Sequence, residues 1–149
     1  MTMSLLEVLT EEMKRALKAQ DKVTLSTVRL LISQLKNERI DSGKELTPDD
    51  EISVLMSAVK KRKESIAAYQ AGNRQDLLEK EQQELEIIQK YLPQQMSDEE
   101  VGRKIDEIIK SAGAIGLKDL GRVMSEAMKE LKGRADGKKV QNIVRSKLT

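Results

Sequence analysis

Apolar residues return every three or four positions along nearly the whole chain, and over no useful length do they alternate with polar residues. The opening segment shows the pattern, with Leu6, Leu9, Met13, Ala16 and Leu17 at helical spacing. This spacing is the period of an amphipathic helix, whereas a strand with one buried face needs a period of two. We therefore expect an all-α fold without strands.

Turn and capping residues divide this pattern into seven expected helices. Glycine is common just after a helix, and proline disfavours helix at the residue before it. A serine followed three residues later by a glutamate is typical of a helix start, as at Ser4 and Ser97. Four longer helices and then three shorter ones are expected, with breaks at Asp21, residues 41–43, Gly72-Asn73, Pro93, Gly113 and residues 133–137.

The break at residues 91–97 is the expected domain boundary. Pro93 ends one apolar stripe, and Ser97 with Glu100 starts the next helix. Residues 1–95 are predicted to form an N-terminal bundle of four helices. Residues 96–149 are predicted to form a dissimilar three-helix tail domain.

The residue types that the chain lacks exclude much chemistry. It has no cysteine, no histidine, no phenylalanine and no tryptophan. Disulfides, zinc fingers, cysteine-held iron–sulfur clusters and histidine-based triads are therefore excluded. We see no phosphate-binding glycine-rich motif either. We expect no catalytic residue, no metal site and no cofactor, so the protein is not expected to be an enzyme on its own.

The ends of the chain and its hydropathy bear on location. The first residues include Glu7 and show no basic segment followed by a long apolar one, and no apolar run reaches 18 residues. A signal peptide and a membrane span are therefore not expected. A cytoplasmic location is the expectation that remains.

Positive charge is concentrated near the C-terminus. The chain carries a net charge of +2, but residues 114–149 hold nine basic and four acidic residues, a net of +5. A cationic surface without aromatic rings suits the phosphates of a folded RNA better than unstacked bases. A purely structural helix–turn–helix is the alternative interpretation. The candidate RNA-binding residues are Lys118, Arg122, Lys132, Arg134, Lys138 and Lys139.

Three further expectations concern local structure. Gly121 stands inside a helical pattern, where glycine costs about 1 kcal/mol relative to alanine, so another helix is expected to approach it closely. Asp136 is expected to cap the last helix, whose free amides offer a place for a phosphate. An ion network between the third and fourth helices is favoured over a ligand site for Arg62, Arg74, Glu81 and Glu84.

The tail resembles the C-terminal domain of the B subunit of the glutamine-dependent aspartyl/glutamyl-tRNA amidotransferase. The resemblance rests on the segments 121–124, Gly-Arg-Val-Met, and 132–135, Lys-Gly-Arg-Ala. The rest is similar to YqeY, the small bacterial protein that shares this tail, through residues 62–65, 73–77 and 91–97. One departure is Asp136-Gly137, where amidotransferase tails tend to read Asn-Pro, which puts the cap of the last helix in question.

The GatB/YqeY resemblance implies a function as well as a fold. In the amidotransferase the matching tail helps to hold the outer corner of tRNA, while kinase and amidase chemistry occurs in other domains and subunits. A similar domain is appended to some glutaminyl-tRNA synthetases. The resemblance implies a non-catalytic tRNA-binding or tRNA-enzyme accessory protein, grouped by its shared domain with carbon–nitrogen ligases that use glutamine as amido donor.

The alternative function is a protein-interaction adaptor that docks on an amidotransferase or an aminoacyl-tRNA synthetase through the four-helix part. Two observations support this alternative: residues 1–113 carry a net charge of −3, and the four-helix part has long apolar stripes. Both interpretations predict a structured RNA or one of its enzymes as partner. Neither predicts DNA specificity or contact with a membrane.

Overall fold

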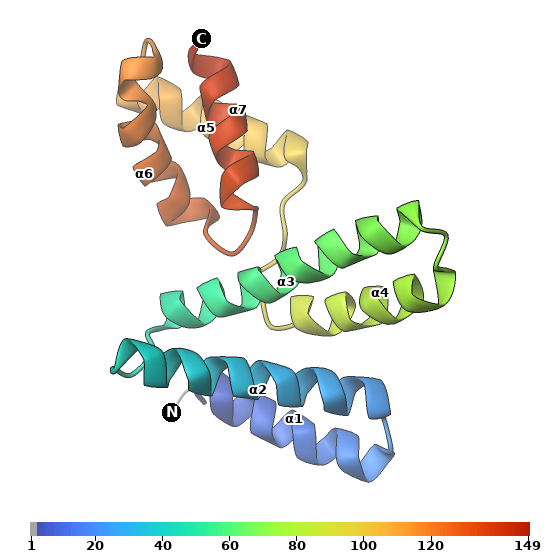
Figure 1. The fold of residues 1–149 in the computed structure, drawn as a ribbon. Helices are drawn as coiled ribbons and strands as arrows, with labels where there is room; N and C mark the ends of the chain where they lie inside the picture. Colours follow the sequence, from blue (N-terminus) through green and yellow to red (C-terminus); the bar gives the residue numbers. More distant parts are fainter. Residues whose placement is uncertain (1–2) are drawn as a thin grey trace. The chain divides into compact units, whose positions relative to one another are not determined.

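The computed structural model describes residues 3–149; Met1 and Thr2, which belong to the predicted N-terminal domain, lie outside the described residues. The described chain forms seven α-helices and one short 3-10 helix, and it contains no strand, so the all-α prediction is confirmed. Figure 1 shows the helices in chain order. They divide into two compact units, Met1–Leu92 and Pro93–Thr149.

Each unit contributes its own set of helices. Unit 1 contains α1 (Leu5–Ala19), α2 (Lys22–Ser42), α3 (Pro48–Ala71) and α4 (Gln75–Gln89). Unit 2 contains α5 (Asp98–Ala112), the 3-10 helix η1 (Leu117–Asp119), α6 (Leu120–Leu131) and α7 (Gly137–Leu148).

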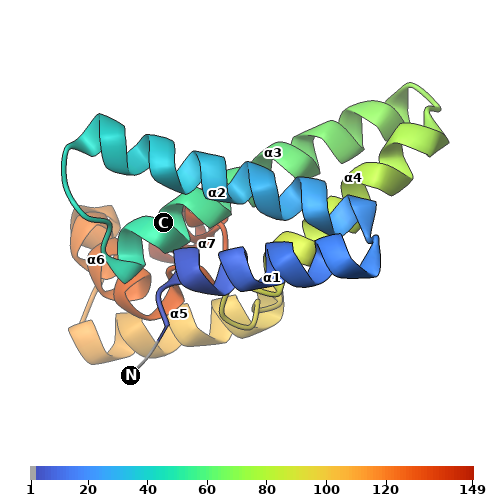
Figure 2. The same cartoon turned by 90° about the horizontal axis from the view of Figure 1, so that it is seen from below.

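Unit 1 consists of two helical hairpins. Helix α1 lies beside α2, and α3 lies beside α4, in both Figure 1 and Figure 2. Each helix sends apolar side chains into one shared core, where Leu9, Leu31, Leu55 and Ile88 are fully buried. The stripes read from the sequence therefore mark most of the buried faces, but Leu17 of the first stripe is 57% exposed.

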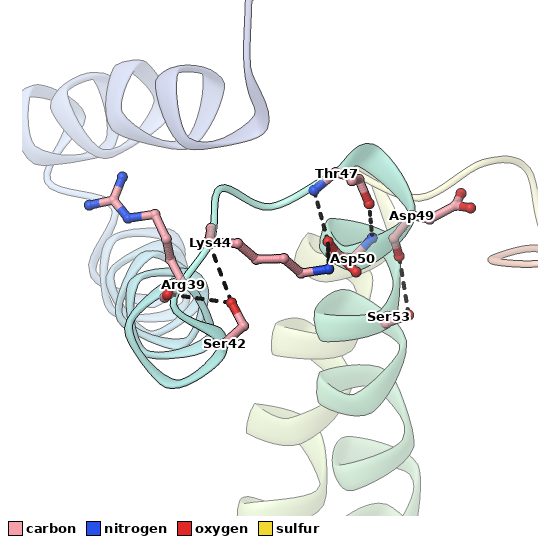
Figure 3. A network of polar contacts seen from close by, with 7 residues as sticks. All are labelled: Arg39, Ser42, Lys44, Thr47, Asp49, Asp50 and Ser53. Carbon is pink, nitrogen blue, oxygen red and sulfur yellow. Dashed lines mark hydrogen bonds and ion pairs between the residues drawn. The ribbon is translucent and has the colours of Figure 1, made fainter.

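The start of α3 is fixed by side-chain capping. The Thr47 hydroxyl accepts from the amide of Asp50 at 3.1 Å, and the Asp50 carboxylate accepts from the amide of Thr47 at 2.9 Å. Figure 3 shows this reciprocal pair, with Lys44 reaching the same carboxylate and Ser53 donating to the Asp49 carbonyl. Two donors at the helix end that lack helical partners are thereby satisfied.

A buried ion network links α3 to α4. Arg62 is only 6% exposed, and its Nε lies 3.4 Å from Glu84 and 3.9 Å from Glu81. The prediction of this network is confirmed for these three residues and wrong for Arg74. Arg74 lies on the exposed turn before α4 and pairs with Asp76 at 3.5 Å, because the turn places it away from the α3–α4 seam.

Unit 2 packs α5, α6 and α7 around a second core. Val101, Val123, Leu131 and Val144 are among its fully buried side chains. Two exposed ion pairs also join α5 to α7, one between Asp98 and Lys139 at 2.8 Å and the other between Asp106 and Lys147 at 2.9 Å. On each helix the two paired residues are eight positions apart and follow in the same order, so the N-terminal part of α5 faces the N-terminal part of α7.

Segment 94–96 is held against the turn that joins α6 to α7. The amide of Met96 donates to the Arg134 carbonyl at 2.9 Å, and Arg134 Nε donates to the Gln94 carbonyl at 3.1 Å. The side-chain amide of Gln95 donates to the carbonyl of Gly133. Gly133 is buried and has a φ of +80°, a conformation that glycine adopts without the cost paid by other residues.

The expectation for Gly121 is wrong. An ideal Cβ built on Gly121 meets no atom within 4 Å, so no other helix approaches it closely. Gly121 is the second residue of α6 and lies on its exposed side, away from the buried Val123. The packing of unit 2 therefore gives no reason for a glycine at this position.

Candidate RNA-binding surface

The six candidate residues lie at two ends of α6. Lys118 and Arg122 are in η1 and the first turn of α6, whereas the other four lie in or beside the turn that leads into α7. A helix of 12 residues is about 18 Å long. The structure therefore does not bring the six residues together as one cluster; the group around the turn is Lys132, Arg134, Lys138 and Lys139.

Three of the six cations already have partners within unit 2. Arg122 pairs with Asp119 at 3.0 Å, Lys139 pairs with Asp98, and Arg134 donates to a backbone carbonyl. Lys118, Lys132 and Lys138 form no ion pair with any residue that the structure describes. A phosphate would compete with an existing contact at the first three positions and meet a free ammonium group at the others.

The exposed face of α7 carries two cations with an asparagine between them, and the sequence-based prediction included only the first cation. Lys138, Asn142 and Arg145 are exposed at positions i, i+4 and i+7, so they share one side of the helix. The opposite side is buried through Val140 and Val144. Helix α7 carries four basic residues and no acidic one, and Arg145 forms no ion pair within residues 3–149. The signal that would have found Arg145 is its place on the helical wheel opposite the apolar stripe.

The N-terminus of α7 is occupied by its own cap. The Asp136 carboxylate accepts from the amide of Lys138 at 3.1 Å, which confirms the predicted cap despite the Asp-Gly departure from the amidotransferase pattern. A negative carboxylate at this position repels a phosphate that would bind the same amides. Contacts to an anion are therefore left to side chains of α7.

Asp119 organises the loop between α5 and α6. Its carboxylate accepts from the amide of Ile115 at 3.0 Å and pairs with Arg122, while its own amide donates to the Gly116 carbonyl at 2.9 Å. The hydrogen bond from Ile115 and, more weakly, the charge of Arg122 lower the pKa of Asp119 below its ordinary value of about 3.8. The loop holds Ile115 in place although this side chain is 79% exposed.

We expect Asp119→Asn to destabilise unit 2 in a pH-dependent way. A carboxyl group whose pKa is lowered by folding stabilises the fold above its unfolded pKa, and this contribution disappears as the pH falls through the folded pKa. The difference in urea midpoint between wild type and variant should therefore be constant above about pH 5 and shrink as the pH falls below about 3.8. The control is Glu99→Gln, which alters an exposed carboxylate without an ion pair in the described structure. If its urea midpoint differed from that of the wild type by the same amount and with the same pH dependence, this role of Asp119 would be contradicted.

An open groove lies between α5 and α6, and Arg122 is one of its lining residues. It has a volume of about 530 Å³, and its charged lining consists of Lys104, Glu107, Arg122, Glu126 and Glu130. Lys104 lies 3.3 Å from Glu130 and 3.6 Å from Glu107, and the hydrogen bond to Glu130 raises the pKa of Lys104. Because carboxylates outnumber cations there, the groove is a poor site for an anion.

Neither a metal site nor a membrane-spanning helix occurs in the described part of the chain. No group of three acidic side chains within residues 3–149 is arranged to hold a metal ion. No helix in that range is long and apolar enough to cross a membrane.

These features define a class: an all-helical protein of two units, whose second unit ends in a cationic helix. A family model described as "Yqey-like protein" matches residues 6–148. The chain belongs to this YqeY-like family, so the resemblance of its sequence to YqeY is confirmed.

Fungal relatives match a large part of the chain, and all three named here are called "Altered inheritance of mitochondria protein 41, mitochondrial". The relative from Vanderwaltozyma polyspora is 33% identical over 75% of this chain and 64% of its own length. The relative from Pyrenophora tritici-repentis is 32% identical over 91% of this chain and 78% of its own length. The relative from Lachancea thermotolerans is 34% identical over 74% of this chain and 63% of its own length. The chain thus spans slightly less than two thirds of two of these relatives.

The expectation of a cytoplasmic location is contradicted by these names, since the relatives are called mitochondrial proteins. That expectation rested on not finding a targeting segment in the sequence. Failure to find a targeting segment does not show where a protein is located, because the folded helices carry no information about the compartment.

Proposed function

We propose that the protein is a non-catalytic accessory that binds folded RNA of the tRNA type through the exposed face of α7. The proposal rests on the acid-free face formed by Lys138, Asn142 and Arg145. Phosphate contacts supply most of the affinity of such surfaces, and side chains with hydrogen-bond donors fix the register. The enzyme that such an accessory would serve is a tRNA-dependent amidotransferase or an aminoacyl-tRNA synthetase.

The distribution of charge within unit 2 supports this choice of surface. Helix α5 carries five acidic residues, whereas α7 carries none. The two α5–α7 ion pairs use Lys139 and Lys147, and they leave Lys138 and Arg145 free on the outer side. These two side chains start about 10 Å apart along the helix axis, a spacing at which they reach different phosphates.

We expect the double variant Lys138→Gln/Arg145→Gln to bind bulk tRNA more weakly and with a flatter salt dependence. For each phosphate that the variant no longer neutralises, the slope of log K against log salt should fall in magnitude by about 0.7 to 0.9. Both positions are exposed, so stability should change by less than about 0.5 kcal/mol. A titration of labelled tRNA followed by fluorescence anisotropy at several salt concentrations measures both quantities.

The matched control is Lys60→Gln/Lys61→Gln/Lys63→Gln, three exposed cations of α3 that form no ion pair in the described chain. This variant removes more charge than the α7 variant does, and it should leave the slope nearly unchanged. An equal loss of binding in the control would mean that diffuse charge holds the RNA. If the anisotropy titration showed no binding of tRNA to the wild-type protein even at low salt, the proposal would be excluded.

A protein adaptor is the competing function, and one observation favours it. Ile115 and Leu117 are exposed apolar side chains on the loop that Asp119 holds in place, and such a surface suits a protein partner. A pull-down with and without RNase separates the two functions. A partner retained after digestion favours the adaptor, and a partner released by digestion favours RNA.

We further propose that the two units, Met1–Leu92 and Pro93–Thr149, are a four-helix and a three-helix domain that fold independently. Their boundary lies three residues before the one that the sequence predicts between residues 95 and 96. Each unit has its own buried core, which supports this division.

A further inference from the structure

Helix α1 carries a second apolar stripe beside the one that enters the core. On the helix the stripe consists of Leu6, Thr10, Met13 and Leu17, with spacings of four, three and four residues, and Met3 lies just before the cap Ser4. Leu6 and Met13 are half-buried against the core, but Met3 is 49% exposed and Leu17 is 57% exposed. The Thr10 hydroxyl donates to the Leu6 carbonyl at 2.7 Å, so it needs no other partner. Figure 1 shows α1 at the outer edge of unit 1, where α2 is its neighbour.

A charged row runs along one flank of this stripe. Glu7, Glu11, Lys14 and Lys18 follow with spacings of four, three and four, and all four side chains are exposed. The row is acidic in the first half of α1 and basic in the second half. Only one ion pair occurs within the row in the described structure, between Lys14 and Glu11 at 3.7 Å, and both side chains are 64% exposed.

We propose that two copies of this chain associate through α1, with the two α1 helices antiparallel and related by a two-fold axis. In this arrangement Glu7 of one copy lies level with Lys18 of the second copy, and Glu11 lies level with Lys14. In a parallel pair about a two-fold axis the two rows would lie on opposite sides of the interface and would not meet, so only the antiparallel pair brings opposite charges of the row together. The two-fold axis makes every contact occur twice, as in an isologous interface.

The shape of the stripe supports the same register. The first half of α1 forms a small hollow of about 290 Å³, lined by Met3, Leu6, Glu7, Thr10 and Glu11. Four of these residues lie on α1 and Met3 lies just before it, and together they leave a hollow that can receive one side chain from a facing helix. With Glu7 level with Lys18, Leu17 of the second copy lies opposite position 8, between Leu6 and Thr10. The most exposed residue of the stripe therefore meets its hollow.

The association is expected to be weak and concentration-dependent. A contact between two helices of 15 residues falls below the roughly 1,200 Å² of buried surface that marks a standard interface. Sedimentation equilibrium of the full chain from about 10 µM to about 1 mM should show the mass rising from one chain toward two.

The first test of this surface replaces its most exposed leucine. Leu17→Glu places a charge at the hollow, and it should leave the protein monomeric over the same concentration range. The matched control is Leu30→Glu, which alters a leucine of α2 that is 41% exposed and lies outside the stripe. The control should self-associate like the wild type, and circular dichroism should show unchanged helix content in both variants.

A charge exchange provides the second test and does not depend on Leu17. Glu7→Lys/Glu11→Lys and Lys14→Glu/Lys18→Glu should each be monomeric, because their rows repel across the two-fold axis. An equimolar mixture of the two should form heterodimers at least as well as the wild type forms homodimers. A wild-type protein that stays monomeric to about 1 mM, a Leu17→Glu variant that is folded yet dimeric, or a mixture that fails to associate would each overturn the proposal.

Discussion

Converting Glu81 and Glu84 together to glutamine is expected to lower the free energy of unfolding of unit 1 by about 3 to 5 kcal/mol. Both carboxylates face Arg62, whose side chain is 7% exposed and whose Nε is buried without a hydrogen bond. Glutamine keeps the shape of each side chain but removes its charge. A buried guanidinium without a compensating carboxylate is the costly state, because the charge has left water and gained no partner.

Urea unfolding followed by circular dichroism at 222 nm measures this loss. The control is Asp76→Asn, which breaks the exposed pair between Arg74 and Asp76 and should cost less than about 1 kcal/mol. Adding Arg62→Met to the double glutamine variant should recover much of the stability, since an unbranched apolar side chain needs no counter-charge. Equal losses in the glutamine variant and in Asp76→Asn would mean that burial of the ion network contributes nothing.

The helices of this protein could be predicted because the residues that fix each helix end are close to that end in the sequence. Gly113 ends α5 in the left-handed conformation, with a φ of +64°, and Asp136 caps α7 through its own side chain. Ser4 and Ser97 also cap their helices as expected, each by accepting from the amide three residues on. Each of these signals lies within a few residues of the helix end that it fixes, so one sequence is enough to read it.

The ion network shows what spacing along the sequence cannot predict, namely which side chains meet between two helices. Arg62 and Arg74 carry the same group, and the break at Gly72-Asn73 already sets Arg74 at a turn, but it does not show that the turn points its side chain away from the seam. The difference is that Arg62 projects into the α3–α4 seam, whereas Arg74 lies on the turn that joins these helices. Such a distinction depends on how two helices face one another, and spacing along one helix does not contain it.

The same limit applies to the cationic surface. Counting charges marks Arg134 and Lys139 as candidates, but their partners Gln94 and Asp98 lie about 40 residues earlier in the chain. These contacts arise only when segment 94–96 and α5 have packed against the last turn and helix. The exposed face of α7 is different, because the helical period alone places Lys138 and Arg145 on one side of the helix. The prediction omitted Arg145 because it considered where charges are concentrated and not which side of the helix each side chain is on.

Leu131→Ala is expected to lower the free energy of unfolding of unit 2 by about 2 to 5 kcal/mol. Leu131 is fully buried at the end of α6, where its removal leaves a cavity in the second core. Its carbonyl also accepts from the amides of Arg134 and Ala135, so this position anchors the turn that carries Gly133. Domains as small as residues 93–149 have only a few kcal/mol of stability to lose, and this variant should therefore unfold unit 2 at or near room temperature.

Amide hydrogen exchange resolved by residue distinguishes the two units in this variant. Protection should collapse at Val123 and Val144 and persist at Leu31 and Ile88, because the two cores share no buried residue. Binding of tRNA should disappear together with the protection of unit 2, since the α7 face no longer exists as a helix. Leu117→Ala, which truncates an exposed leucine of η1, is the control and should leave both units protected. Loss of protection in both units of Leu131→Ala would show that they fold as one cooperative body, and tRNA binding that survived the unfolding of unit 2 would place the RNA surface on unit 1.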